Sequence, residues 1–365
     1  MSLKDSIICQ DGHLLRPIKK KKDYYLNRTS LIFGRTHSGK TTILNEILYI
    51  CKDYIPNVWV ISRTHDLNDN FSKIIPKIFI KKNLNNDFLF TLLERQKGLS
   101  SIFKMVNDIK NLYSLFCKIA SEKELNLYDK LSIIEENIIM SIKEKKDNNN
   151  YCNDINKIKS LTNKNKLKYM KKIIYQKQNN LNKKNLSKQE KNIIHYLYLN
   201  PNTLIVLDDC ASSFKLWYKK CKKDKRSYKY GNPIKSLFYE GRWMHITLII
   251  TAQDDKEIDP ELRKNALVTI FTTEESVLSS FSRTANSHPM YIKRQADIFS
   301  RAIFSDKNKN NYKKLVYIKI HGECPFRYTV ASIYNNFKVG SINSWIYSEK
   351  IMKLKKKEEY NKYLI

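Results

Sequence analysis

The sequence predicts an α/β fold in which helices flank a mostly parallel central sheet and a helical insertion rich in Lys and Asn interrupts the core. Short apolar runs without strict alternation recur along the chain, as is typical of strands covered on both faces. One such run leads through a glycine-containing loop into apolar residues at helical spacing. Between residues 84 and 200 there is no proline and only one glycine, which favours helices.

Seven apolar runs are expected to be strands, and they lie at residues 30–33, 58–61, 78–80, 204–207, 246–250, 267–271 and 315–320. The run 42–50 follows the first of them and carries apolar residues at helical spacing, which predicts a helix there. With 365 residues, of which 42% are apolar, the chain can form one large α/β domain or two smaller ones.

Changes in composition divide the chain into four parts. We expect the first half of the core at residues 1–83, the helical insertion at 84–200, the second half of the core at 201–340 and a basic tail at 341–365. The second half of the insertion, residues 141–200, has 15 Lys against 4 acidic residues. Within the insertion, isoleucines recur at helical spacing, at 133, 134, 138, 139 and 142. This pattern suits packing against the core, a neighbouring subunit or a capsid, and the sequence does not decide between them.

The charge of the chain points to polyanionic partners. Lys and Arg number 67 against 36 Asp and Glu, which gives a formal charge of +31. Such an excess attracts nucleic acid. An AT-rich genome would also raise the frequency of Lys, Ile, Asn and Tyr codons, so codon composition is an alternative explanation of the charge.

Membrane and metal-cluster classes are not indicated. No apolar run approaches the roughly 18 residues that span a bilayer, and the N-terminus lacks an apolar signal core, so we expect a soluble intracellular protein with no membrane partner. The seven cysteines are scattered without a C-x-x-C pair, which argues against a zinc site and a disulfide framework.

Residues 34–41 carry the strongest motif in the chain. They read Gly-Arg-Thr-His-Ser-Gly-Lys-Thr and fit the pattern G-x-x-x-x-G-K-[ST] without a mismatch. The glycines let backbone N–H groups turn toward phosphate oxygens, the lysine brings a charge to the β and γ phosphates, and the last hydroxyl can bind magnesium. We therefore predict a site for ATP and Mg²⁺, whose nucleotide-binding residues are Gly34, Arg35, Thr36, His37, Ser38, Gly39, Lys40, Thr41 and Thr42.

Polar residues close two further predicted strands. The run 204–207 ends in Asp208 and Asp209, and a carboxylate at that strand end would lie beside the phosphate loop. We expect Asp208, together with Thr41, to bind the metal, and Asp209 to orient the attacking water. Acids after buried strands are often simple helix caps, so the assignment depends on the phosphate loop. Gln253 closes the run 246–250 and is a candidate γ-phosphate sensor.

Taken in order, these motifs resemble the genome-packaging ATPases of nucleocytoplasmic large DNA viruses, the poxvirus-type members of the FtsK/HerA superfamily. The resemblance adds to the phosphate loop and Asp-Asp strand a segment at 58–62, the pair Gly241-Arg242, the strand leading to Gln253, and Leu-Arg-Lys-Asn at 262–265. It covers about residues 25–85 and 200–335 and leaves out the insertion. Very many NTPases share the phosphate loop. The later motifs, Gly241-Arg242, Gln253 and the segment 262–265, make the resemblance specific to this family.

The resemblance implies an additional-strand P-loop core, in which another strand separates the phosphate-loop strand from the strand bearing Asp208. It also implies a hexameric or pentameric homo-oligomeric ring that hydrolyses ATP, is stimulated by DNA and threads duplex DNA into a capsid without regard to sequence. Capsid protein and a nuclease are further candidate partners. The expected location is the virus factory in the host cytoplasm, and the virion.

Ring ATPases of this type complete each site with an arginine from the neighbouring subunit. Arg263 is the first candidate and Arg242 the second, and both are also suited to a surface salt bridge or a DNA phosphate contact. Arg35 would instead act within its own subunit. The sequence departs from the family pattern at Asp209, where relatives often have Glu, and at Trp243, where many have His.

Other functions remain open from the sequence. A related DNA pump or helicase in replication or segregation would carry the same motifs. A nucleotide kinase shares the phosphate loop, although the position of the Asp-Asp strand and the chain length speak against it. A non-enzymatic scaffold, with bound ATP as a structural element, is a further alternative. Basic residues around 219–229 are a candidate DNA-contacting loop or a solvated one.

Overall fold

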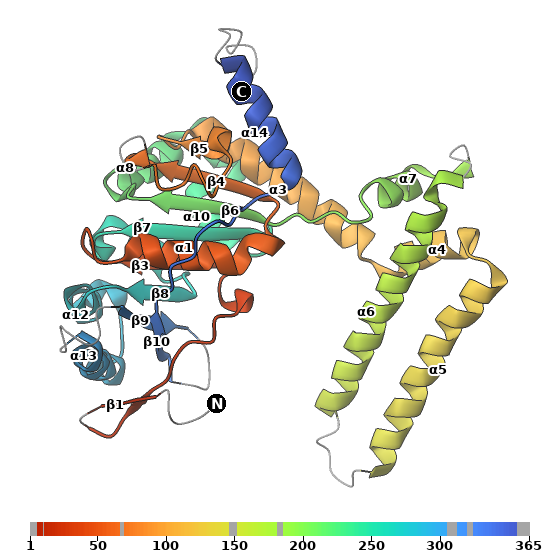
Figure 1. Ribbon diagram of the computed structural model, residues 1–365, viewed down its shortest axis with the longest axis horizontal. Helices are drawn as coiled ribbons and strands as arrows, with labels where there is room; N and C mark the ends of the chain where they lie inside the picture. Colours follow the sequence, from red (N-terminus) through yellow and green to blue (C-terminus); the bar gives the residue numbers. More distant parts are fainter. Residues whose placement is uncertain are drawn as a thin grey trace. The chain divides into compact units, whose positions relative to one another are not determined.

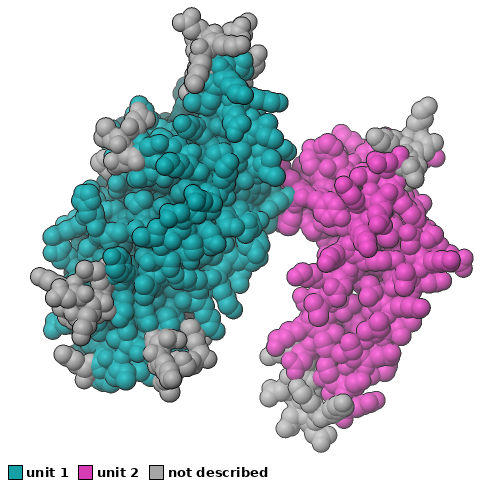
Figure 2. Space-filling view, in the orientation of Figure 1, with its two compact units in different colours: residues 1–97, 200–365 teal, residues 98–199 magenta. Residues whose placement is uncertain are grey.

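The structure is a computed structural model that describes residues 6–9, 11–65, 69–145, 152–180, 185–304, 312–319 and 324–355. The chain forms two compact units, Met1–Lys97 with Asn200–Ile365, and Gly98–Leu199, coloured separately in Figure 2. The division falls after Lys97 rather than after residue 83, because Leu89, Leu92 and Leu93 are buried in the core of the first unit.

An eight-stranded sheet forms the centre of the first unit (Figure 1). Its order is β10-β9-β8-β3-β7-β6-β4-β5. The strands are β3 Thr29–Phe33, β4 Asn57–Ser62, β5 Ile80–Lys81, β6 Thr203–Asp208, β7 Ile246–Ala252, β8 Val268–Phe271, β9 Lys313–Ile318 and β10 Phe326–Val330. A separate antiparallel pair consists of β1 Ile7–Ile8 and β2 Leu14–Leu15.

The sheet confirms the predicted fold class. Strands β5, β4, β6, β7, β3 and β8 are parallel, and β9 and β10 are antiparallel to their neighbours. Strand β7 lies between β3, which leads into the phosphate loop, and β6, which carries Asp208. This is the additional strand that the resemblance implied. The expected strand at 78–80 is wrong in its first two residues, because Lys77–Phe79 forms a 3₁₀ helix before β5.

Helices cover both faces of this sheet. Helix α1 packs on one face with Ile43, Leu44 and Ile47. The first part of α3, with α8, α10, α11, α12 and α13, contributes apolar residues to the opposite face. The helices are α1 Lys40–Cys51, α3 Asn86–Val106, α8 Ala211–Lys223, α9 Lys225–Tyr230, α10 Pro233–Tyr239, α11 Pro260–Arg263, α12 Glu274–Ser282, α13 Met290–Phe304 and α14 Ile342–Lys355. Because both faces are buried, the strands need no alternation of polar residues, as the sequence indicated.

The second unit is helical. It contains the end of α3, then α4 Ile109–Ile119, α5 Glu122–Lys145, α6 Cys152–Lys177 and α7 Lys188–His195. Leu112, Phe116 and Ile174 belong to its own small core. Helix α5 confirms the predicted helix, but Ile133 and Ile134 are each 54% exposed. The apolar spacing of α5 therefore marks, in part, a solvent-facing surface in this structure.

Two basic segments differ from their sequence interpretation. The residues around 219–229 form the end of α8 and helix α9 rather than a loop, and Arg226 is paired with Asp87 and Asp224. In the tail, α14 packs on the 3₁₀ helix before β5, where Ser348 Oγ accepts a hydrogen bond from the Ile78 N–H. Residues 356–365 of the tail lie outside the described residues.

None of the helices that the structure describes has the combination of length and apolar character needed to cross a membrane.

Candidate nucleotide site

The phosphate loop connects the end of β3 to the start of α1, and its geometry requires both glycines. Gly34 has φ +154°, and a Cβ there would lie 1.7 Å from Thr272 Oγ1. Gly39 has φ +90° at the N-cap of α1. A side chain at Gly34 would collide with β8's C-terminal end, and one at Gly39 would strain the backbone. Thr272 lies 238 positions after Gly34 in the chain and leaves no room for a side chain there. The conformation of the loop therefore depends on this distant residue as well as on its own sequence.

Lys40 lies at the start of α1 with only 8% of its surface exposed. Its Nζ donates hydrogen bonds to the carbonyl oxygens of Gly34, at 2.8 Å, and Arg35, at 2.9 Å. Burial lowers the pKa of Lys40, whereas the nearby carboxylates of Asp209, Asp208 and Glu257 act in the opposite direction. A lysine folded back onto its own loop has only neutral acceptors, which a phosphate would replace by charged ones.

The N-terminus of α1 adds a second feature suited to an anion. No side chain caps this helix, and its first turn contains no acidic residue. The first N–H groups of a helix have no intrahelical acceptor, and the helix dipole places partial positive charge there. The 12-residue helix therefore presents an uncompensated positive end directly behind the phosphate loop. These residues fit the nucleotide phosphates that the motif predicted.

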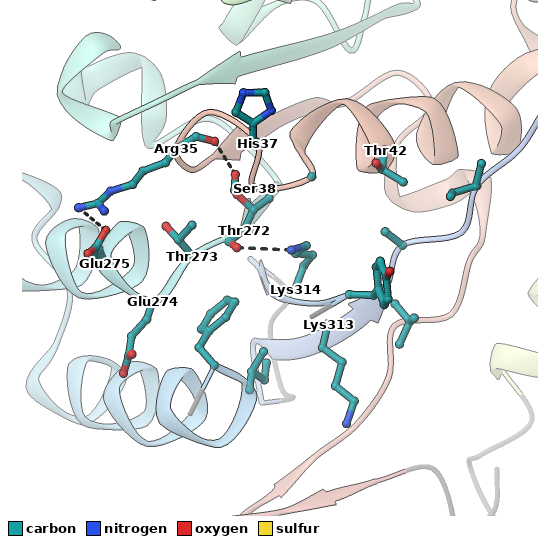
Figure 3. A pocket seen from close by; sticks show the side chains of 17 residues that line it. Arg35, His37, Ser38, Thr42, Thr272, Thr273, Glu274, Glu275, Lys313 and Lys314 are labelled. Atoms are coloured by element: carbon teal, nitrogen blue, oxygen red, sulfur yellow. Dashed lines mark hydrogen bonds and ion pairs between the residues drawn. The ribbon is translucent and has the colours of Figure 1, made fainter. Parts of the chain in front are cut away.

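The remaining loop side chains divide by exposure. Thr36 and His37 are exposed, and His37 has φ +60°. Ser38 Oγ donates to the Arg35 carbonyl at 2.6 Å and also contacts Thr272 Oγ1. Thr41 and Thr42 are half-buried at the first turn of α1. His37 lines the same cavity as Ser38, Thr272 and Lys314 (Figure 3).

Asp208 is fixed at the end of β6 by the two strands beside it. Its Oδ1 accepts a 2.7 Å hydrogen bond from Thr251 Oγ1 of β7, and its Oδ2 accepts a 3.4 Å bond from Ser62 Oγ of β4. The residue is 6% exposed, and burial raises the pKa of its carboxyl while the Thr251 hydrogen bond lowers it. A carboxylate with two hydroxyl donors keeps lone pairs for a further cation or water.

Asp209 differs from Asp208 in exposure and in backbone conformation. It is exposed, has φ +46°, and its N–H donates to Thr251 Oγ1 at 3.1 Å. A non-glycine residue in the left-handed region costs free energy, and such residues concentrate at functional sites. Thr251 therefore holds both acids: it donates to the Asp208 carboxylate and accepts from the Asp209 backbone.

Gln253 follows β7 and is exposed, and its N–H donates to Glu257 Oε2 at 3.3 Å. Glu257 belongs to the short 3₁₀ helix Asp255–Glu257. Burial, then the charges of Asp254 and Asp209, raise the pKa of Glu257. Glu257 thus adds a further carboxylate near Asp209 and Lys40.

A cavity of about 1020 Å³ opens beside the phosphate loop (Figure 3). The loop contributes polar groups to one side, and the opposite side combines apolar residues of α13 and β10 with lysines of β9. Its lining includes Ser38, Gly39, Thr42, Thr272, Ile303, Phe304, Tyr312, Lys314, Val330 and Ile333. A polar end and an apolar wall suit a ligand that carries both phosphates and a ring.

The candidate arginines lie in three different settings. Arg35 is exposed and forms a 2.6 Å ion pair with Glu275 of α12. Arg242 is exposed just before the start of β7. It therefore lies at the end of the sheet where the parallel strands begin, and the phosphate loop lies at the end where they finish. Arg263 is only 9% exposed, and its guanidinium is paired with Asp255 of its own chain. For Arg263 to reach a neighbouring subunit it would have to leave this ion pair, and its role as a trans arginine stays a prediction.

Arg263→Gln is expected to destabilise the fold by about 3 kcal/mol, because it leaves the buried Asp255 carboxylate with Arg283 as its remaining cation. The measurement is the free energy of unfolding in urea. Arg242→Gln is the matched control and should leave that free energy unchanged, since the arginine is exposed. Equal stability of the two variants would contradict a structural role for Arg263.

The sequence did not reveal three contributors to this site. Ser62, Thr251 and Glu257 are positioned by strand neighbours or by a short turn. Thr251 could have been found from the sequence, because it is a polar residue at the end of an apolar strand. Glu257 has no local motif, because its proximity to Asp209 arises only when β6 and β7 pair.

Comparison with known proteins gives relatives in viruses and similar folds. No protein-family model matches the chain. It is 28% identical over 321 residues to the uncharacterized protein B354L of African swine fever virus, covering 84% of this chain and 83% of the relative. It is similar to the pCW3 conjugation coupling protein TcpA in its monomer form with ATPγS, with TM-score 0.38, 11% identity and coverage of 97% and 73%. It is also similar to the genome packaging NTPase B204 from Sulfolobus turreted icosahedral virus 2, with TM-score 0.35, 11% identity and coverage of 88% and 100%.

Proposed function

We propose that the chain binds ATP with Mg²⁺ on the phosphate loop and hydrolyses it. One observation carries this proposal: the loop, with buried Lys40, and the pair Asp208 and Asp209 are brought to the same edge of the sheet by β3, β7 and β6. The charges of both acids act on the pKa of Lys40, which supports assigning the three groups to one site. Such a site binds a phosphate chain on one side and offers carboxylates on the other.

Each residue then has a distinct part. The Lys40 ammonium exchanges the carbonyls of Gly34 and Arg35 for phosphate oxygens. Thr41 and Asp208 would hold Mg²⁺, which supplies charge neutralisation at the phosphates when bound. Asp209, exposed and held by Thr251, accepts a hydrogen bond from the attacking water and orients it. Gln253, beyond the end of β7, is placed to respond to the γ phosphate, and Glu257 orients its backbone.

The work done by hydrolysis is, in this proposal, sequence-independent translocation of viral duplex DNA into capsids by a homo-oligomeric ring. The formal charge of +31 supports a polyanionic partner. The ordered motifs around Arg242, Gln253 and Arg263 support the packaging family, and the relative B354L is a viral protein. The virus factory and the virion are the corresponding locations. Capsid protein and a nuclease are the corresponding further partners.

The test is ATP hydrolysis by the full chain with and without long duplex DNA. DNA is expected to raise the turnover several-fold at low salt, and the stimulation should fall steeply as salt rises, because phosphate contacts release counterions. Hydrolysis that ignores duplex DNA at low salt would rule out the motor while leaving the ATPase intact. Phosphoryl transfer to a small acceptor without DNA would instead favour a kinase.

A second measurement separates packaging from a related DNA pump or helicase. A packaging motor should associate with empty capsids and should not separate the strands of a duplex. A helicase gives the reverse result in a strand-displacement assay. These motors share the chain's motifs, so capsid association and strand displacement are the measurements that distinguish a packaging motor from a helicase.

A further inference from the structure

Lys314 is a buried lysine on the strand that enters the sheet beside the phosphate loop. Strand β9 runs antiparallel to β8, so that Leu315 pairs with Phe271 and the residues before it reach the phosphate-loop edge of the sheet. The side chain is 6% exposed. Lysines are almost never this buried unless they are paired, because removing an ammonium from water is costly.

The contacts of Lys314 do not compensate its charge. Among the residues that the structure describes, its Nζ donates one hydrogen bond, to the Thr272 carbonyl at 3.5 Å, which is at the long end of the range. Among the described residues no carboxylate forms an ion pair with it, and burial is the cause that lowers its pKa. Elsewhere a buried charged group does have a partner: the buried Glu46 carboxylate forms a 2.7 Å ion pair with Lys20.

The position of Lys314 explains what could compensate it. A Cβ built on Gly39 would lie 3.4 Å from Lys314 Cε and 3.6 Å from its Nζ. Gly39 is the uncapped N-cap of α1, so the ammonium and the positive end of the helix lie side by side. Lys314 also lines the cavity beside the loop, with Ser38 and Thr272 (Figure 3). Two positive groups therefore face one cavity. The acids in its described lining, Glu274 and Glu275, belong to α12, and Glu275 is paired with Arg35.

We propose that Lys314 is a second phosphate-binding cation of the nucleotide site, one that contacts the phosphate oxygens lying against Gly39. This proposal rests on the proposed nucleotide binding and extends it. Lys40 belongs to α1 and Lys314 to β9, so two lysines from different elements would bind the phosphates. The Thr272 carbonyl orients the Lys314 ammonium when no anion is present.

The test uses three variants of the full chain. Lys314→Met removes the charge but keeps a long, unbranched side chain. Lys314→Arg keeps the charge. Lys319→Met is the matched control, because Lys319 follows the same strand at the opposite edge of the sheet and donates to the carbonyls of Arg263 and Lys264. Dissociation constants for ATPγS and adenosine are measured by calorimetry, and thermal unfolding is followed without ligand.

Lys314→Met is expected to weaken ATPγS binding about 10- to 100-fold and to leave adenosine binding unchanged, because adenosine lacks phosphates. Lys314→Arg should retain most of the affinity, and Lys319→Met all of it. The melting temperature of Lys314→Met without ligand should not fall, since an uncompensated buried charge has been removed.

The outcomes distinguish this inference from the proposed function. A wild-type chain that does not bind ATPγS overturns the proposed function and the inference with it. Binding by wild type with equal affinity in Lys314→Met overturns the inference alone. A Lys314→Met variant that unfolds or melts much lower shows that the lysine is a structural element, and this also overturns the inference.

Discussion

Lys40→Ala is expected to abolish ATP hydrolysis, with turnover at least about 100-fold below that of the wild type. The reason is that Lys40 is the cation closest to the carbonyls of Gly34 and Arg35, where the loop closes around the phosphates. Charge that develops on transferred phosphate oxygens is stabilised by such a fixed cation, and removing it costs several kcal/mol of transition-state stabilisation. Release of inorganic phosphate under saturating ATP measures the effect.

Two controls make the result specific to the site. Lys52→Ala removes a lysine just beyond the end of α1, whose ammonium pairs with Asp53, and should leave turnover unchanged. Thermal unfolding of Lys40→Ala should remain close to that of the wild type, because the change removes a buried ammonium, which is costly to desolvate, together with its two hydrogen bonds to carbonyls. Retained hydrolysis in a folded Lys40→Ala variant would contradict the assignment of residues 34–41 as the catalytic nucleotide site.

The parts of the site that are local in sequence could be predicted from it. The phosphate loop is specified by residues within eight positions of each other, and its two glycines have the backbone angles that the motif requires. The Asp-Asp strand could be predicted because a buried apolar run followed by acids is also a local pattern. The family resemblance implied that another strand separates this strand from β3, and the observed strand order, with β7 between them, confirms it.

The parts that depend on distant pairing could not be predicted. Thr272 closes against Gly34 across 238 positions, and Lys314 reaches Gly39 only because β9 runs antiparallel to β8. No local pattern distinguishes Lys314 from its neighbour Lys313 among so many lysines. Burial, which is a property of the folded chain, is what distinguishes it.

Arg263 and helix α5 show that a local motif does not predict how exposed its side chains are. The motif at 262–265 made Arg263 the first candidate for a trans arginine, with a surface salt bridge or a DNA contact as alternatives. In the structure Arg263 is paired with Asp255, and both side chains are buried. The isoleucine spacing in α5 correctly indicated a helix and left its partner open. The exposure of Ile133 and Ile134 shows that the second unit alone does not bury that part of the helix.

The second large effect is expected at Asp209, where function and stability should respond in opposite directions. Asp209→Asn should lower turnover about 100-fold or more, because an amide cannot take a proton from the attacking water. Nucleotide binding should be retained, since the loop and Asp208 are unchanged. Single-turnover hydrolysis, together with calorimetric binding of ATPγS, separates the two effects.

Asp209→Gly tests whether the positive φ of this residue stores strain for the site. Glycine adopts φ +46° without the steric cost that a β-carbon imposes, and the change also removes a negative charge that raises the pKa of the buried Asp208. The free energy of unfolding is therefore expected to stay the same or to rise by up to about 1 kcal/mol, while hydrolysis is lost. An exposed acid that served only as a cap after β6 would behave differently, since its removal would cost stability and spare turnover. Urea unfolding and phosphate release on the same preparation thus decide whether the strained backbone at Asp209 serves the reaction or only the fold.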